Sequence, residues 1–404
     1  MFEEIGNEKS EIVCPLCGSS GLWVFYTVIN VPASCNRLWK SKDDAINCPK
    51  GNIKLAFCSS CTFVSNVAIE PEKNRYDDQY DNSLFYSPHF QEFAKKLASS
   101  LIERYGLHGK NIVEIGGGKV DFISLLVGLG QNYGIRFDPF RSKVEFADRG
   151  IAYPTSSVLG SLPFLDERNK VDFVFSYHEL EHINDPKSFL KDLRMMLDKS
   201  GSVIVFFSVP NVMKAFEEGE YSDVIYEHVS YFTVPSLFYL FSSCGFDISS
   251  VEETKGEIFD SIYVVATLKQ GELFPNLKSN SELESVQIKQ RVQKFAAKTT
   301  ENINKCSQKL TKLLDEGNRI VIWGAGARGL TFLNILKDQR IKYTVDINPR
   351  KQGMYIPGTG QKIVNPTFLA EYKPDFVLLA NPAYKQEIQW ILDDLKIKTK
   401  FISL

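Results

Sequence analysis

The sequence predicts an α/β protein with a Rossmann-like parallel sheet, a zinc-binding region in front of it and a second, smaller Rossmann-like domain behind it. Three observations predict this arrangement. Two Cys-x-x-Cys pairs lie near the start of the chain, and two separate stretches alternate short apolar runs with helical segments, from residue 111 to about 268 and from about 319 onward. Such alternation is typical of a parallel sheet covered by helices on both faces.

The composition indicates a globular protein that acts on small molecules. Hydrophobic residues make up 44% of the 404 residues and charged residues 24%, the usual range for packed domains. A net charge of −2 and a pI near 6.3 provide no positive field for nucleic acid or an anionic membrane. No apolar run approaches the roughly 20 residues that span a bilayer, and the acidic start is unlike a secretory signal. We therefore expect a cytoplasmic monomer or small homo-oligomer without nucleic-acid or membrane partners.

The length allows two or three domains at roughly 150 residues each, and changes in composition indicate three. The expected segments are a zinc-binding knuckle domain over 1–75, a catalytic domain over 76–270, a linker with a long helix over 271–316 and a Rossmann-like substrate-binding domain over 317–404. The first segment has too little apolar periodicity to form a large core of its own. A structural metal can stabilise such a small domain in place of a core. In the linker, apolar residues from Leu283 to Leu313 recur mostly every three or four positions, which predicts an amphipathic helix.

The two Cys-x-x-Cys pairs predict a structural zinc site. The expected ligands are Cys14, Cys17, Cys58 and Cys61. Four thiolates suit a tetrahedral zinc ion, and a closed sulfur shell leaves no position for a reactive water. Two metal-free reduced turns or redox-active dithiols are the alternatives. Of the other cysteines, Cys35 and Cys48 are expected to be free thiols, and Cys244 and Cys306 to be core residues.

The central segment contains four apolar runs that read as buried strands. They are NIVEI, NYGIRFD, VDFVFSY and SVIVFFSV, between residues 111 and 209. A helix should precede them, since apolar residues from Phe90 to Ile102 recur at helical spacing. Two later runs, DISSVEE and SIYVVATL, follow each other without a helix and are expected to pair antiparallel at the sheet edge.

A nucleoside cofactor is predicted at the turn after the first of these strands. Gly116 and Gly118 let the backbone approach a ligand that side chains would exclude. Asp138 ends the next strand, where a carboxylate can accept both hydroxyls of a ribose. Because the pattern is Glu-x-Gly-x-Gly and not Gly-x-Gly-x-x-Gly, it fits S-adenosylmethionine better than a dinucleotide. Glu114 would then interact with the methionine ammonium.

The run HELEH lies where the VDFVFSY strand ends, the edge at which open α/β sheets bind ligands. His178 and Glu179 are expected to line the cofactor site, and Glu181 and His182 are further candidates. Two histidines four residues apart also suggest a catalytic zinc. The run lacks the helical context of a metalloprotease, so lining the cofactor or capping a helix is the preferred interpretation.

The order of these blocks resembles the sugar C-methyltransferases that act on nucleotide-linked deoxysugars. The resemblance rests on the paired Cys-x-x-Cys motifs, EIGGG, IYEHVSYFT, and GAGARG followed by VDINPRKQGMYIPGTGQKI, and it covers nearly the whole chain. It implies a zinc knuckle, a class I methyltransferase sheet that binds S-adenosylmethionine, and a C-terminal Rossmann-like domain that helps to hold a nucleotide sugar.

The same resemblance implies which residues perform the chemistry. His228 corresponds to the general base, which abstracts a proton beside a sugar ketone, and the carboxylate of Glu227 is expected to orient its imidazole. The enolate would then attack the sulfonium methyl. A hydroxyl of Tyr76 or Tyr80 could stabilise the oxyanion. Methyl transfer to an oxygen is the runner-up reaction, and an ordinary loop histidine is the alternative for His228.

The C-terminal segment carries a Gly-x-Gly-x-x-Gly run between a strand and a helix, and Asp346 ends the next strand. This pattern alone would indicate NAD. The expected role is nucleotide-sugar binding instead, with a pure scaffold and NAD binding as alternatives. The candidate substrate-binding residues are Gly324, Gly326, Arg328 and Lys351. Two hypotheses from other functional classes remain as alternatives to a methyltransferase: a non-catalytic binding protein and an NAD-dependent enzyme.

Overall fold

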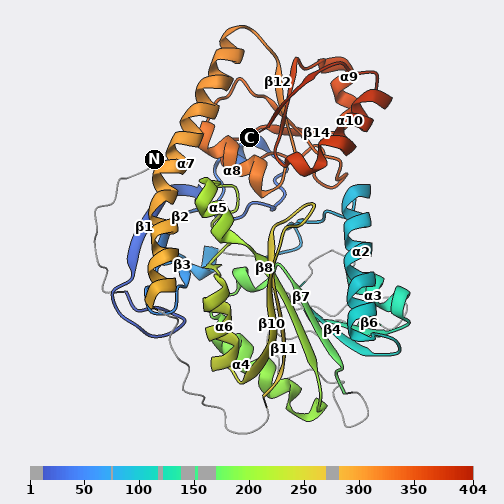
Figure 1. The fold of residues 1–404 in the computed structure, drawn as a ribbon. Coiled ribbons are helices and arrows are strands. Elements are labelled where there is room, and N and C mark those ends of the chain that lie inside the picture. The colour runs from blue at the N-terminus through green and yellow to red at the C-terminus, as the bar shows by residue number, and fades with distance from the viewer. Residues whose placement is uncertain are drawn as a thin grey trace.

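The computed structural model describes residues 12–73, 76–116, 122–137, 151–152, 170–269 and 282–403, which form three sheets with covering helices (Figure 1). The third sheet lies at one end of the molecule and the central sheet at the other. Helix α7 (Glu282–Asp315) runs along one side between them. It is the long helix that the linker periodicity predicts.

The first sheet is antiparallel and has the strand order β1-β2-β3-β9. Its strands are β1 (Trp23–Pro32), β2 (Lys50–Phe57), β3 (Val64–Asn66) and β9 (Ser230–Tyr231). Helix α1 (Lys42–Ile46) and a 3-10 helix (Pro71–Lys73) lie in its connections. The sequence did not predict this sheet, because its core is completed from far along the chain. Tyr26 packs on Phe295 of α7 with ring centroids 4.8 Å apart.

The central sheet has the order β10-β11-β8-β7-β4-β5-β6. Its strands are β4 (Asn111–Ile115), β5 (Tyr133–Phe137), β6 (Ile151–Ala152), β7 (Phe173–Tyr177), β8 (Ile204–Pro210), β10 (Phe246–Thr254) and β11 (Ser261–Leu268). From β8 to β6 all neighbours are parallel, whereas β11 pairs antiparallel with β8 and β10. The four predicted buried strands and the antiparallel edge pair are thus confirmed.

In the described part of this segment there are five helices, and most begin at recognisable caps. They are α2 (Pro88–Tyr105), α3 (Phe122–Gly130), α4 (Pro186–Leu197), α5 (Val212–Glu218) and α6 (Val234–Ser243), with 3-10 helices at Leu180–His182 and Asp198–Ser200. Of these, α5 packs on α7 and in the core of the first sheet. The hydroxyl of Ser87 accepts from the backbone of Phe90 at the start of α2, as preferred N-cap residues do. Gly106 ends α2 in the left-handed conformation.

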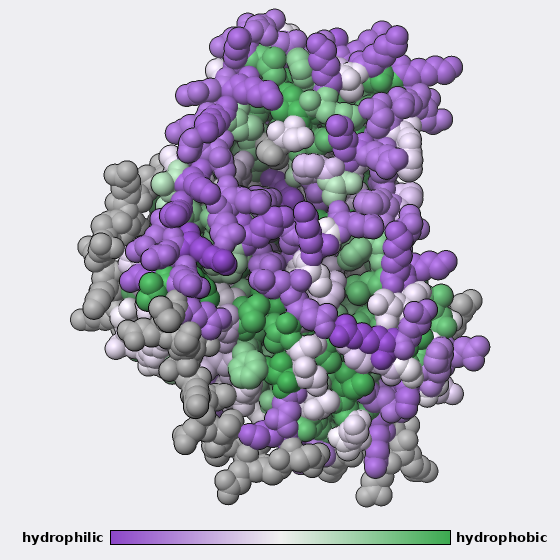
Figure 2. Space-filling model, in the orientation of Figure 1, coloured by the Kyte–Doolittle hydropathy of each residue, from purple (hydrophilic) through white to green (hydrophobic). Residues whose placement is uncertain are grey.

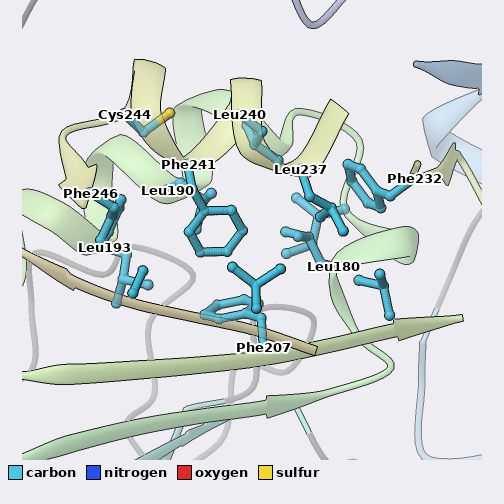
Figure 3. Packing of buried hydrophobic residues seen from close by; sticks show 14 of the residues in the cluster. Leu180, Leu190, Leu193, Phe207, Phe232, Leu237, Leu240, Phe241, Cys244 and Phe246 are labelled. Carbon is cyan, nitrogen blue, oxygen red and sulfur yellow. The ribbon is translucent and has the colours of Figure 1, made fainter. Parts of the chain in front are cut away.

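Neighbouring residues of β8 pack on opposite faces of the sheet, as the period of a strand requires. Phe206 stacks on Phe175, in the core that α2 and α3 cover. Phe207 meets Phe241 of α6 edge to face, with centroids 5.5 Å apart, in the core shared by α4 and α6 (Figure 3). Both faces of the sheet are therefore buried, which explains why its strands are continuous apolar runs.

The third sheet is entirely parallel and has the order β14-β13-β12-β15-β16. Its strands are β12 (Ile320–Trp323), β13 (Tyr343–Val345), β14 (Lys362–Val364), β15 (Phe376–Leu379) and β16 (Lys400–Ser403). Its helices are α8 (Ala327–Leu336), α9 (Leu369–Tyr372) and α10 (Lys385–Asp394), with 3-10 helices at Pro366–Phe368 and Pro382–Tyr384. The second α/β alternation in the sequence therefore forms a Rossmann-like sheet.

Polar contacts hold the third sheet against the rest of the chain. Glu387 of α10 accepts hydrogen bonds from the Ser87 hydroxyl, at 2.6 Å, and from the His89 amide, at 2.9 Å. Asp81 accepts from the side chain of Asn348 and pairs with Arg350. These contacts fix the two halves around the cavity described next.

On the face shown in Figure 2, the surface is mostly polar around the third sheet, while apolar side chains gather in the region of the central sheet. Among the described residues, no helix combines the length and the apolar character needed to cross a membrane.

Candidate active site

A cavity of about 340 Å³ lies between the central and third sheets. Its lining includes His178 and Pro210, at the carboxyl ends of β7 and β8, and Gly324 and Arg328, from the turn and helix after β12. Ligands of open α/β sheets bind at such strand ends. Because two sheets present these ends to one cavity, it can hold a ligand that both halves of the protein contact.

At the end of β7, His178 adopts a left-handed backbone conformation with φ of 51°. Its Nε2 lies 2.9 Å from the hydroxyl of Ser261, and its ring stacks on Tyr177. Burial lowers the pKa of His178 to about 3, so the ring is neutral at physiological pH. His178, predicted to line the cofactor site, therefore lines the interdomain cavity as a neutral side chain.

The predicted cofactor turn begins at Gly116, which has φ of 81°. A Cβ atom there would lie 2.3 Å from a carboxylate oxygen of Glu179. The positive φ and this close approach both require glycine. The structure thus brings Gly116 and Glu179 together, as expected of residues around one ligand. Gly118 and Asp138, the other predicted cofactor residues here, lie outside the described residues.

Glu114, the predicted partner of the methionine ammonium, forms an ion pair within the sheet. Its carboxylate lies 2.5 Å from Nε of Arg136 on the neighbouring strand β5, and both side chains are buried. A buried carboxylate requires such a partner. The ion pair joins β4 to β5 next to the predicted cofactor turn, and contact of Glu114 with the methionine ammonium stays a prediction.

Three chemically active side chains from two segments meet in the cavity. Glu181 and His182 belong to the 3-10 helix after β7, and His228 precedes β9; donor atoms of all three lie within 4.8 Å of one another. Burial lowers the pKa of His182 to about 3 and that of His228 to about 4, and it raises the pKa of Glu181 to about 8. Sequence reasoning singled out each residue but did not place them together.

The orientation of His228 is a correction to the sequence prediction. Its Nδ1 donates to the main-chain carbonyl oxygen of Asp223 at 2.8 Å. The carboxylate of Glu227 instead accepts from the Ser34 hydroxyl and the Cys35 amide, at 3.1 and 2.9 Å. Consecutive residues on an irregular segment point in different directions, which explains the error. Glu227 joins the first sheet to this segment, and Asp223 is the orienting residue that sequence reasoning missed.

Tyr76 and Tyr80 stand beside this cluster, with ring centroids 4.9 Å apart. The hydroxyl of Tyr76 lies 3.0 Å from Nδ1 of His182. Tyr80 lines the cavity, and burial raises its pKa well above the usual value, so it remains a hydroxyl donor. The structure therefore brings Tyr76 to His182 and places Tyr80 in the wall of the cavity that His228 also lines.

The third sheet supplies two cations to the site. Arg328, at the start of α8, lies 3.4 Å from Glu220 and 3.7 Å from Asp223. Lys351 donates to the carbonyl oxygen of Ala325 in the glycine-rich turn, and it is buried. Gly324 and Gly326 line the cavity with them. All four predicted substrate-binding residues of this domain therefore border one cavity.

Asp346, the acidic residue of the apparent NAD pattern, is engaged within the protein. Its Oδ2 accepts from the amide of Ala325 at 2.9 Å, and its Oδ1 accepts from the amide of Asn348. In a dinucleotide site this carboxylate would bind the ribose. Here it holds the glycine-rich turn in place.

The four predicted zinc ligands form one cluster away from the cavity. The sulfur atoms of Cys14 and Cys61 are 3.7 Å apart, and those of Cys17 and Cys58 are 3.6 Å apart. Zinc–sulfur bonds of about 2.3 Å in a tetrahedron place sulfur atoms about 3.8 Å apart. The geometry and the donor set therefore fit a zinc ion.

Comparisons with known proteins agree with this architecture. Residues 90–251 match a family described as methyltransferase domain, and residues 263–403 match one described as C-methyltransferase C-terminal domain. The chain is 24% identical over 392 residues to the C-methyltransferase NovU of Streptomyces niveus, which covers 93% of this chain and 90% of that protein.

Solved structures of methyltransferases are also similar over less than half of the chain. One is an S-adenosylmethionine-dependent methyltransferase from Aquifex aeolicus, with a TM-score of 0.34, 15% identity, and coverage of 46% of this chain and 95% of that chain. Another is a putative S-adenosylmethionine-dependent methyltransferase from Listeria monocytogenes, with a TM-score of 0.34, 13% identity, and coverage of 45% and 100%.

The two family matches and the full-length relative define the class: the chain is an S-adenosylmethionine-dependent methyltransferase. The C-terminal match and the relative that spans the chain are both described as C-methyltransferases. The resemblance seen in the sequence is confirmed at this level.

Proposed function

We propose that the protein methylates a carbon beside the ketone of a nucleotide-linked keto-deoxysugar, through an enolate formed by His228. The observation that carries the proposal is the single cavity that joins His228 to the glycine-rich turn of the third sheet. A nucleotide sugar has a reactive end and a nucleotide end separated by a diphosphate. A site built from both halves of the chain suits such an elongated substrate.

In the proposed reaction, His228 removes the proton next to the ketone. Because Nδ1 donates to the carbonyl oxygen of Asp223, the lone pair of the neutral ring is on Nε2. Because burial lowers the pKa of His228 to about 4, the ring is neutral at physiological pH and Nε2 can accept a proton. The hydroxyl of Tyr76 or Tyr80 would donate a hydrogen bond to the enolate oxygen.

The remaining groups would position the two substrates. S-adenosylmethionine, held near Gly116 and Glu179, supplies an electrophilic methyl group to the enolate carbon. Arg328 and Lys351 lie where cations would attract the diphosphate of the substrate. We assign zinc at the cysteine cluster a structural role, since four thiolates leave no open coordination position.

The proposal is tested with S-adenosylmethionine carrying a carbon-13 methyl group and a panel of nucleoside diphosphate keto-deoxysugars. A carbon–methyl resonance in the product, together with solvent exchange of the proton beside the ketone in D₂O, is the expected result. An oxygen–methyl resonance without that exchange would replace carbon by oxygen as the acceptor. If S-adenosylhomocysteine does not bind in calorimetry but NAD does, the chemistry belongs to the third sheet and the proposal is wrong.

A further inference from the structure

The cluster of Glu181, His182 and His228 has a feature that the proposed proton transfer does not require. Two imidazoles and one carboxylate lie together, with their donor atoms within 4.8 Å of one another, at the wall of a cavity. A single base would need one imidazole. Two histidines and a carboxylate are instead the ligand set of many open metal sites.

A main-chain carbonyl oxygen orients each imidazole, as is common for histidines that bind a metal. His228 donates Nδ1–H to the carbonyl oxygen of Asp223, at 2.8 Å. His182 has its Nδ1 3.1 Å from the carbonyl oxygen of Glu227, and a carbonyl oxygen can only accept. Each ring therefore carries its lone pair on Nε2. A backbone carbonyl bonded to the other nitrogen is the usual second-shell partner of a ligating histidine.

The carboxylate of Glu181 supplies an independent observation. Its side chain is 2% exposed, and its Oε2 has no hydrogen-bond partner among the described residues. Leaving a buried carboxylate oxygen unpaired costs free energy unless a proton or a cation approaches it. By contrast, Glu387, which lines the same cavity, accepts two hydrogen bonds from protein groups.

We propose that Glu181, His182 and His228 form a second metal site, which binds a divalent transition metal such as Zn²⁺ or Co²⁺ with its open coordination positions toward the cavity. Nitrogen and oxygen ligands about 2.0 to 2.2 Å from a tetrahedral ion lie roughly 3.4 Å apart. The donor atoms, which lie within 4.8 Å of one another, therefore need to approach by about 1.4 Å at most, which small changes of side-chain rotamer provide. This site differs from the cysteine cluster in having no sulfur ligand.

The metal and the proton would compete for one nitrogen. If His228 is the base, as the proposed function has it, a metal on its Nε2 prevents deprotonation of the substrate. The site would then make methyl transfer sensitive to free transition metal and reversible by a chelator. This consequence rests on the proposed function, whereas metal binding itself does not.

The test titrates Co²⁺ into protein whose cysteine cluster already holds zinc. We expect one further equivalent of Co²⁺, with visible d–d absorption but without the intense near-ultraviolet bands of cobalt–thiolate bonds. Glu181→Gln and His182→Asn should each weaken binding at least tenfold. His108→Asn, which changes an exposed histidine outside the cavity, is the matched control and should bind Co²⁺ as wild type does.

A second measurement uses wild-type protein with isotope-labelled histidines, so its result does not depend on whether a variant folds. Among the five histidines, Co²⁺ should shift or broaden the ring resonances of His182 and His228 first, while His108 stays unchanged. Absence of saturable binding, thiolate bands alone, or equal affinity in Glu181→Gln and wild type would overturn the site. Saturable binding without loss of methyl transfer would leave the metal site intact and instead remove His228 as the base.

Discussion

His228 is oriented by the main-chain carbonyl oxygen of Asp223, which accepts its Nδ1–H at 2.8 Å, and not by the adjacent carboxylate of Glu227. Because any residue type can supply a main-chain carbonyl oxygen, this hydrogen bond could not be predicted from the sequence. It also sets the tautomer of the ring, which leaves the lone pair on Nε2.

The first prediction distinguishes the role of His228 as the base from the role of the adjacent Glu227. His228→Asn should lower methyl transfer by about 100-fold or more, the usual contribution of a general base, and should abolish solvent exchange beside the ketone. Glu227→Gln should retain the orientation of His228 and lose far less activity. It should instead destabilise the fold by about 1 to 3 kcal/mol, because its new amide meets the donor groups of Ser34 or Cys35.

These two variants are compared by exchange measured with NMR and by urea unfolding. Equal loss of exchange in both, with unchanged stability of Glu227→Gln, would show that the carboxylate takes part in proton transfer after all.

The second prediction concerns the cofactor turn. Gly116→Ala should weaken binding of S-adenosylhomocysteine by about tenfold or more, since a side chain at φ of 81° costs roughly 1 to 2 kcal/mol and collides with Glu179. Gly128→Ala is the matched control, because a Cβ there meets no atom within 4 Å. Calorimetry in which both variants bind equally would place the cofactor elsewhere.

Elements whose pattern depends on their own sequence were predictable. The runs that became β4, β7 and β8 are buried on both faces, so they are visible as apolar stretches whatever packs on them. Helix α7 shows an apolar stripe with a period near 3.6 residues.

Features that depend on distant partners were not predictable. Strand β1 belongs to a core completed by Phe216 and Phe295, which follow it by roughly two hundred residues or more. The proximity of Glu181 to His228 likewise depends on how the segment after β7 packs against the segment before β9. Residue type identified both as candidates, but only the fold sets the distance between them.

The third prediction concerns removal of zinc. The cysteine cluster belongs to one core with Phe63, which precedes β3, with Phe232, which precedes α6, and with Leu240 of α6. Losing the metal should therefore loosen both regions. Cys58→Ser should lower the melting temperature by at least about 5 °C and should increase hydrogen exchange in α6.

Cys306→Ser, on α7 and outside the cluster, is the control and should retain the zinc equivalent and normal hydrogen exchange in α6. If Cys58→Ser retains a full zinc equivalent and normal exchange in α6, the cluster is not the structural site.

The fourth prediction is a dependence of stability on pH. Burial lowers the pKa of His178 to about 3, from 6.5 in an unfolded chain. Between these values the unfolded chain binds more protons, so the stabilising contribution is complete above pH 6.5 and is lost as the pH falls toward 3. From pH 7 to pH 5 this residue should remove up to about 2 kcal/mol from the free energy of unfolding.

His178→Asn isolates this effect, because asparagine tolerates the left-handed backbone of this position and does not titrate there. At pH 7 the variant should be the less stable protein, since it loses the ring stacking on Tyr177. At pH 5 the difference should shrink, because only the wild type must protonate a histidine on unfolding. Urea unfolding at both pH values measures the two differences. A constant difference would mean that His178 titrates alike in the folded and unfolded chains, and that its ring is open to solvent.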